Sequence, residues 1–320
     1  MRIISFNSYK GGACRTTTCF NTLPFIAKNL GATAHQPILV FDADLDSMGL
    51  TTILAKNVFN NAPFSSQNLF VDDGDVISEI SNFGLESVET DSFFKKFKKV
   101  GNELGLEDDG SVLFCGADMK ASTISDDKFK TMKKDMPLFD IINALNDMAE
   151  EDRPKAIIFD CAAGVQPSTL FILSVAQYFV MCMRPTLQFR IGTLDYLETK
   201  IPDQIKMAKN NYRKQIILCP TSVASVDKAA NGEESDELRL LRASAYKKIE
   251  VMKQKIMLYD FSELGYDLNT KMIESVDDMG IPEIDRFKWE ECLLYSVPNK
   301  TEREEELIKK YEKLAGIICE

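Results

Sequence analysis

Apolar residues fall into short, nearly continuous runs that alternate with longer stretches of helical periodicity. The runs predict strands covered on both faces, because half-exposed strands would alternate apolar and polar residues instead. The predicted strands are Arg2–Asn7, Ile38–Asp42, Val112–Cys115, Ala156–Asp160, Tyr178–Met183 and Ile216–Cys219. The predicted helices are Thr16–Leu30, Leu138–Glu150, Ser168–Gln177, Gly192–Lys209, Glu237–Lys255 and Glu302–Leu314. This alternation predicts an α/β fold with a doubly wound, mainly parallel sheet and helices on both faces.

Two polar stretches interrupt the alternation. Phe59–Gly74 and Ser222–Ser235 are predicted loops, and the second contains the turn-forming pair Asn231-Gly232. Neither has the composition of an interdomain linker, so we expect a single domain over residues 1–320.

Composition and charge narrow the class of protein. The 320 residues are 45% hydrophobic and 27% charged, which is typical of a globular protein with a sizeable core. Lysine and arginine total 38 against 49 acidic residues, and this net charge of -11 disfavours nonspecific nucleic-acid binding. The eight cysteines form no CxxC pair, and the N-terminus lacks a signal-peptide core. We therefore expect reduced thiols and a cytoplasmic location.

A glycine-containing loop follows the first predicted strand. It runs from Tyr9 to Thr18 and contains Gly11, Gly12, a cation at Arg15 and a threonine, just before a predicted helix. Backbone N–H groups of such a loop and the start of the helix attract phosphate. The loop departs from the common pattern G-x-x-x-x-G-K-[ST], so taken alone it is weak evidence.

Acidic residues end two other predicted strands. Asp42-Ala43-Asp44 closes one strand, and Asp160 closes the strand that begins at Ala156. The carboxyl ends of parallel strands form the edge where open α/β sheets bind ligands, and carboxylates hold Mg²⁺ there through water. The sequence therefore predicts a phosphate and magnesium site at this edge.

The stretch Lys10-Gly11-Gly12-x-x-Arg15-Thr16-Thr17 resembles the deviant Walker A motif of the ParA/MinD superfamily of P-loop ATPases, in the variant that carries arginine. Asp42-Ala43-Asp44 resembles the switch I segment of that family, and Asp160 resembles its Walker B aspartate. The resemblance covers most of the chain. Segments of about 57–110 and 222–275 are expected to be variable.

The resemblance implies ATP and Mg²⁺ as cofactors and a role for each matching residue. Lys10 would reach the phosphates of a partner subunit, Arg15 would contact the β and γ phosphates of its own subunit, and Asp44 would position the attacking water. Nucleotide binding is implied for Gly11, Gly12, Ala13, Cys14, Arg15, Thr16, Thr17, Pro220 and Thr221. Magnesium binding is implied for Thr16, Asp42 and Asp160.

Two departures from the family bear on turnover. Arg15 presents a planar guanidinium group where the family usually has the compact ammonium group of lysine. Cys14 stands where glycine is usual, and we expect its side chain to strain the backbone there by about 1–2 kcal/mol. The resemblance therefore indicates an ATP hydrolase with slow turnover.

Three functions stay open. The first is a Mg-ATP-dependent dimerisation switch that acts on an unidentified protein partner. The others are a catalytically weak nucleotide-binding adaptor and a ParA-type DNA-segregation ATPase. DNA is disfavoured because the lysine clusters at 95–99, 128–134 and 247–255 are flanked by acids. A membrane partner is disfavoured because the C-terminal segment is acidic, and we expect that helix to pack on its own sheet.

Overall fold

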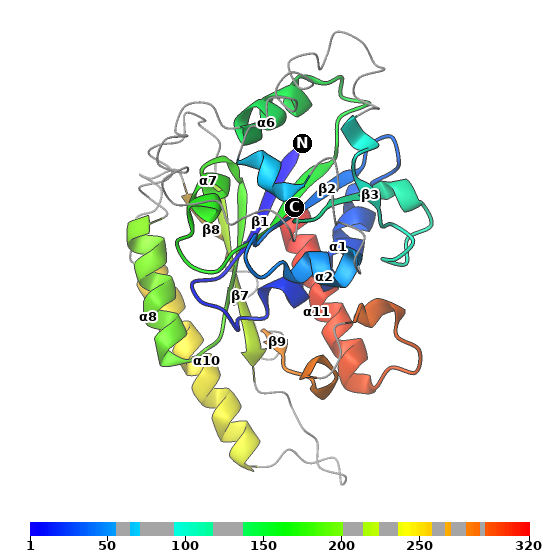
Figure 1. The fold of residues 1–320 in the computed structure, drawn as a ribbon. Helices are drawn as coiled ribbons and strands as arrows, with labels where there is room; N and C mark the ends of the chain where they lie inside the picture. Colours follow the sequence, from blue (N-terminus) through cyan, green and yellow to red (C-terminus); the bar gives the residue numbers. More distant parts are fainter. Residues whose placement is uncertain are drawn as a thin grey trace.

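The strands of the chain pair into a mostly parallel sheet (Figure 1). The computed structural model describes residues 1–55, 65–70, 93–117, 137–200, 214–223, 236–257, 266–269, 280–288 and 292–320. The strand order is β3-β4-β2-β5-β1-β6-β7-β8, and β9 pairs with the end of β7. The strands are β1 (Arg2–Asn7), β2 (Ile38–Ala43), β3 (Lys98–Lys99), β4 (Val112–Cys115), β5 (Ala156–Cys161), β6 (Tyr178–Met183), β7 (Lys214–Val223), β8 (Tyr266–Asn269) and β9 (Ile281–Pro282).

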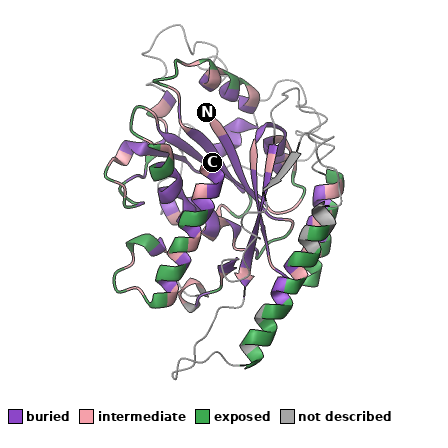
Figure 2. Cartoon of the chain, turned by 180° about the vertical axis from the view of Figure 1, so that it is seen from behind, coloured by how far each residue is buried: buried purple, intermediate pink, exposed green. Residues whose placement is uncertain are grey.

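Among the described strands, only β3 runs antiparallel to its neighbour, which is β4. Figure 2 shows the central strands as buried, in keeping with their continuous apolar sequences. The predicted doubly wound α/β fold is confirmed.

Helices cover both faces of the sheet. They are α1 (Arg15–Leu30), α2 (Gly49–Ala55), α6 (Pro137–Asp147), α7 (Pro167–Val175), α8 (Leu187–Asp195), α10 (Asp236–Met257) and α11 (Glu302–Cys319). Short 3-10 turns occur at Ser66–Leu69, Asp109–Ser111, Asp285–Lys288 and Leu294–Ser296, and a π-helical turn, Tyr196–Lys200, follows α8. Among the described helices, none is both long and apolar enough to cross a membrane.

The C-terminal helix α11 begins with a capping box and packs inside the protein. The Thr301 hydroxyl accepts from the Glu304 N–H at 3.3 Å, and Glu304 Oε2 accepts from the Thr301 N–H at 2.8 Å. Tyr311, Leu314 and other apolar side chains of α11 are buried, and the helix lies along α1. The sequence predicted that this helix packs onto its own sheet; it packs chiefly along α1 and also contacts β9.

Some sequence predictions need adjustment. The helix predicted at Gly192–Lys209 begins earlier, at Leu187, and residues 201–209 lie outside the described residues. The loops predicted at Phe59–Gly74 and Ser222–Ser235, and the lysine cluster at 128–134, also lie wholly or mostly outside them. All eight cysteines are described, and all are free thiols.

The sheet order brings the predicted site together. β1 lies between β5 and β6, and β5 in turn lies beside β2, with Asp42 and Asp160 in register. Because these strands are parallel, their carboxyl ends meet at one edge, directly beside the loop that leads from β1 into α1.

Candidate functional site

The loop between β1 and α1 is built around two glycines and one strained cysteine. Gly12 has a φ of 82°, which glycine adopts without a steric cost, and Lys10, Gly11 and Gly12 are exposed. Cys14 has a φ of 51° and precedes α1, so its side chain sits on a left-handed backbone. The predicted strain at Cys14 is therefore present. The N-terminus of α1 lies directly after the exposed residues of the loop.

Neighbouring segments hold this loop in place. The Gly164 N–H, in the loop after β5, donates to the Ser8 carbonyl at 2.8 Å. A Cβ atom at Gly192 of α8 would collide with the Tyr9 ring, so the ring lies directly on the backbone of α8. The loop is thus supported from two sides of β1.

The end of β7 also fastens the loop. The Thr221 hydroxyl donates to the Ala13 carbonyl at 2.8 Å, and the Ser222 hydroxyl lies 3.2 Å from Cys14 Sγ. Pro220 and Thr221, which the resemblance implied in nucleotide binding, are both buried. In this structure Thr221 fastens the loop between β1 and α1.

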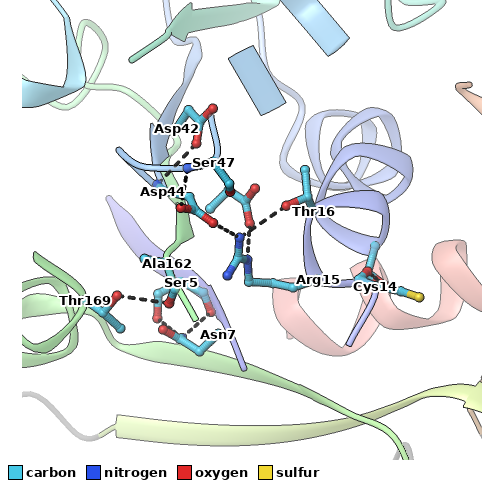
Figure 3. A network of polar contacts seen from close by, with 12 residues as sticks. Ser5, Asn7, Cys14, Arg15, Thr16, Asp42, Asp44, Ser47, Ala162 and Thr169 are labelled. Carbon is cyan, nitrogen blue, oxygen red and sulfur yellow. Dashed lines mark hydrogen bonds and ion pairs between the residues drawn. The ribbon is translucent and has the colours of Figure 1, made fainter. Parts of the chain in front are cut away.

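Arg15, the first residue of α1, joins two of the predicted acids (Figure 3). Its Nε donates to Asp160 Oδ1 at 2.7 Å, and its Nη2 donates to Asp44 Oδ2 at 2.7 Å. All three side chains are at least 90% buried. Burial opposes the charge on the guanidinium, but Asp160 and Asp44 outweigh that effect and raise the pKa of Arg15.

Asp42 points to a different neighbour. Its Oδ2 accepts from both the backbone N–H and the hydroxyl of Thr51 in α2, each at 2.7 Å, and its Oδ1 accepts from the Asp44 N–H at 3.2 Å. Burial, together with the nearby Asp160 carboxylate, raises the pKa of Asp42 to about 7. The pair of acids that meets on Arg15 is thus Asp44 and Asp160, while Asp42 anchors α2.

The donor atoms fit a magnesium ion bound by oxygen. Asp160 Oδ2 is buried and has no hydrogen-bond partner, although buried carboxylate oxygens normally have one. Thr16, which carries a hydroxyl, follows Arg15 directly, and Arg15 Nη2 lies 3.3 Å from that oxygen. Mg²⁺ prefers such hard oxygen ligands and keeps several waters. Within the described part of the chain, no three His, Cys, Asp or Glu side chains form a metal centre by themselves.

Replacing Cys14 by glycine is expected to raise the free energy of unfolding by about 1 kcal/mol. The left-handed backbone costs a residue with a Cβ atom about 1–2 kcal/mol, and the greater freedom of glycine in the unfolded chain offsets part of that gain. Urea unfolding without nucleotide measures the change. Ser222→Ala is the control, because it removes the contact to Cys14 and leaves the backbone alone. A less stable Cys14→Gly variant would show that the Cys14–Ser222 contact outweighs the strain.

No protein-family profile and no curated protein matches the sequence. Solved structures match over nearly the whole chain. Apo McdA from Cyanothece has 15% identity and a TM-score of 0.55, covering 97% of this chain and 99% of that chain. A Cyanothece McdA–ATP complex has 14% identity and a TM-score of 0.52, covering 99% and 96%. The chain has the fold of the ParA and MinD ATPases.

Two further neighbours with the ParA/MinD fold were solved with other ligands. ParA of pNOB8, bound to nonspecific DNA, has 14% identity and a TM-score of 0.51, covering 99% of this chain and 97% of that chain. MinD of Pyrococcus horikoshii, complexed with Mg-ADP, has 12% identity and a TM-score of 0.50, covering 98% and 94%. The sequence resemblance is thus confirmed at the level of the fold.

Three residues of the site were not found from the sequence. Thr51 holds Asp42, Ser222 touches Cys14, and the Ser47 N–H donates to Asp44 Oδ1 at 3.2 Å. Each is a common polar residue in a loop or helix, and only the chain's path brings it to the site. No sequence signal distinguishes them.

Proposed function

We propose that this chain, as a single domain over residues 1–320, is a Mg-ATP-dependent dimerisation switch with slow ATP hydrolysis. The observation that carries the proposal is the meeting of Asp44 and Asp160 on Arg15, beside a glycine loop at the start of a helix. This arrangement combines a phosphate-binding loop, a cation and acids for magnesium at one sheet edge. The nucleotide-bound forms of the McdA and MinD neighbours support the choice of ATP and Mg²⁺.

Phosphate binding falls to the loop and the first turn of α1. The backbone N–H groups from Gly12 to Thr17 and the dipole of α1 would hold the phosphates. Thr16, Asp42 and Asp160 would hold Mg²⁺. The bound ion would neutralise negative charge on the phosphates. Asp42 also accepts two hydrogen bonds from Thr51, which fix the start of α2 beside the site.

Arg15 would exchange partners when ATP enters. Without nucleotide its guanidinium is fully engaged by Asp44 and Asp160. Phosphate oxygens offer the same planar fork two new acceptors, so the β and γ phosphates compete with the carboxylates for Arg15. Release of Asp44 would leave this carboxylate available to orient the attacking water. In this way nucleotide binding and assembly of the hydrolytic site are coupled.

Lys10 would make the contact between subunits. Its side chain is exposed at the tip of the loop, and the backbone next to it is open to a second molecule. We expect Lys10→Ala to keep its affinity for ATP as a monomer but to lose ATP-dependent dimerisation, because the lost contact exists only in the dimer. Light scattering with Mg-ATP measures the dimer, and fluorescent ATP titration measures the affinity. Lys95→Ala, at another exposed lysine, is the control. An unchanged dimer fraction in Lys10→Ala would contradict the role.

A catalytically weak adaptor is the second candidate. It is favoured by the strained Cys14 and by an arginine that two acids already engage. Measured ATP turnover separates it from the switch, since the adaptor binds ATP without hydrolysing it.

The third candidate, a ParA-type DNA-segregation ATPase, requires duplex DNA as a partner. The acidic charge of the chain disfavours it, whereas one structural neighbour was solved on nonspecific DNA. Salt-dependent binding to an arbitrary duplex would reveal it, because phosphate contacts weaken steeply as salt rises.

A further inference from the structure

Thr51, in the first turn of α2, links the acids of the site to the end of β4. Its hydroxyl donates to Asp42 Oδ2 at 2.7 Å and accepts from the Ala117 N–H at 2.9 Å. The N–H of Thr51 also donates to Asp42 Oδ2, again at 2.7 Å. Thr51 is 2% exposed, and Asp42 and Ala117 are fully buried. Because water does not compete for these groups, the three hydrogen bonds hold α2, β2 and the residue after β4 together.

These hydrogen bonds leave Asp42 with one open acceptor position. A carboxylate offers about four lone-pair positions, two on each oxygen. Thr51 fills both positions on Oδ2, and the Asp44 N–H, at 3.2 Å, takes one of the two on Oδ1. The terminal torsion of an aspartate is otherwise broad, so Thr51 decides how this carboxylate is turned. It leaves Oδ1 as the oxygen that can accept from a metal-bound water.

The neighbouring strand presents a second open oxygen on the same face of the sheet. Asp42 and Asp160 are register partners on the parallel strands β2 and β5, so their side chains leave the sheet in the same direction. Asp160 Oδ2 is buried and has no hydrogen-bond partner among the described residues. Two carboxylates with acceptor positions to spare therefore lie side by side, and Mg²⁺ is commonly held in this way, through its waters.

The start of α2 also lies against Thr16, the proposed magnesium ligand of α1. A Cβ atom placed on Gly49 would come within 3.2 Å of Thr16 Cγ2 and 3.4 Å of the Thr16 hydroxyl oxygen. The backbone at Gly49 thus limits the space in which that hydroxyl can turn. Thr51 stands two residues further along α2 and is tied to Asp42, so it fixes the position of Gly49 as well.

We infer that Thr51 is the positioning residue of the magnesium site, which turns Asp42 and holds the start of α2 against Thr16. The inference rests on the proposed function and deepens it, because Thr51 prepares two of the three proposed ligands. Thr51 does not act as a ligand itself, since its hydroxyl hydrogen and its N–H both go to Asp42. Loss of a hydrogen-bond partner that orients a metal ligand typically weakens metal binding by roughly 10–100-fold.

The first test removes the hydroxyl of Thr51 and keeps its shape. Thr51→Val is expected to raise the Mg²⁺ concentration for half-maximal ATP-dependent dimerisation by roughly tenfold or more. Thr51→Ser keeps the hydroxyl and is expected to retain the wild-type value. Thr52→Val is the control, because this exposed neighbour bonds only to the Met48 carbonyl. Light scattering during a Mg²⁺ titration at fixed ATP gives the values, and an unchanged requirement in Thr51→Val would overturn the inference.

ATP affinity with and without the ion separates positioning from a general structural role. Fluorescent ATP is titrated in Mg²⁺ and again in EDTA, and circular dichroism checks the fold. Thr51→Val is expected to bind ATP more weakly than the wild type in Mg²⁺ and equally well in EDTA. An equal loss in both conditions would show that valine disturbs the phosphate loop as a whole, and the inference would fail.

A second variant reaches the site without changing Thr51. Gly49→Ala adds the Cβ atom that approaches Thr16, while alanine favours a helix more than glycine does. We expect α2 to be at least as stable and the Mg²⁺ requirement to rise severalfold, so the variant also serves if Thr51→Val does not fold. Gly316→Ala in α11, where nothing lies within 4 Å of the added atom, is the control. A wild-type requirement in Gly49→Ala would overturn the assigned contact of α2 with Thr16.

The wild-type chain tells a failure of the inference from a failure of the proposed function. If the wild type binds ATP equally well in Mg²⁺ and in EDTA, there is no magnesium site to position, and both are refuted. If the wild type depends on Mg²⁺ while Thr51→Val behaves in the same way, the proposed function stands and only the role of Thr51 is refuted.

Discussion

Replacing Arg15 by methionine is expected to lower the free energy of unfolding by about 3–5 kcal/mol in the absence of nucleotide. The guanidinium is the shared partner of Asp44 and Asp160, each at 2.7 Å and each buried. Removing one member of a buried ion pair leaves uncompensated charge in a poorly solvated place, which is costly. Urea unfolding without ATP measures the loss, so an effect on ATP binding does not enter.

An exposed arginine supplies the matched control. Arg239 pairs with Asp236 at 3.2 Å on the surface of α10, and Arg239→Met is expected to change stability by less than about 0.5 kcal/mol. Adding Asp160→Asn to Arg15→Met should recover part of the loss, because a buried charge is then removed. A loss below about 1 kcal/mol for Arg15→Met would show that the three charges do not hold together in solution.

Asp44→Asn is expected to reduce ATP turnover by roughly 10²-fold or more without weakening ATP binding, because it removes one of the two carboxylates that compete with the phosphates for Arg15. Phosphoryl transfer depends on positioning and on charge stabilisation, and the proposed task of Asp44 is to orient water, with no part in holding ATP. The variant should accumulate the ATP-bound dimer. Turnover measured by phosphate release, alongside the dimer fraction from light scattering, decides the matter.

Two comparisons sharpen this test. Asp46→Asn, two residues along and exposed, should hydrolyse ATP as the wild type does. Asp42→Asn and Asp160→Asn should instead weaken magnesium-dependent dimerisation, because their proposed part is in binding. Wild-type turnover in Asp44→Asn would refute its role, and a wild type without turnover would favour the adaptor.

The central strands were predictable from local sequence, and the starts of α1, α10 and α11 were predictable to within one residue. β1, β4 and β6 match their predicted bounds, since buried strands need an unbroken apolar run. β3 and β9 have two residues each, too few to form a pattern, and β8 lacks an apolar run because two of its four residues, Asp267 and Asn269, are polar. α2 begins at Gly49, which favours no helix, and it owes its start to the Thr51 contacts with Asp42.

The sequence indicates which residues lie at the site, but it does not show which of their side chains contact one another. Asp44 and Asp160 lie at or just after the carboxyl ends of parallel strands, and these ends meet beside the loop between β1 and α1. Their approximate positions therefore follow from the sequence, whereas the directions of their side chains do not. The direction of Arg15 depends on its rotamer and on which acid lies within reach, and both require the folded chain. For the same reason the turn of Asp42 towards Thr51, and the hold of Thr221 on Ala13, have no signature in the sequence.

The contact of Tyr9 with Gly192 constrains how this sequence can diverge. No side chain larger than hydrogen fits at residue 192 while the ring occupies its place. A relative with a small residue at position 9 is free to carry alanine or a larger residue at 192, and a relative with an aromatic ring at 9 is not. Across an alignment the two positions should therefore change together.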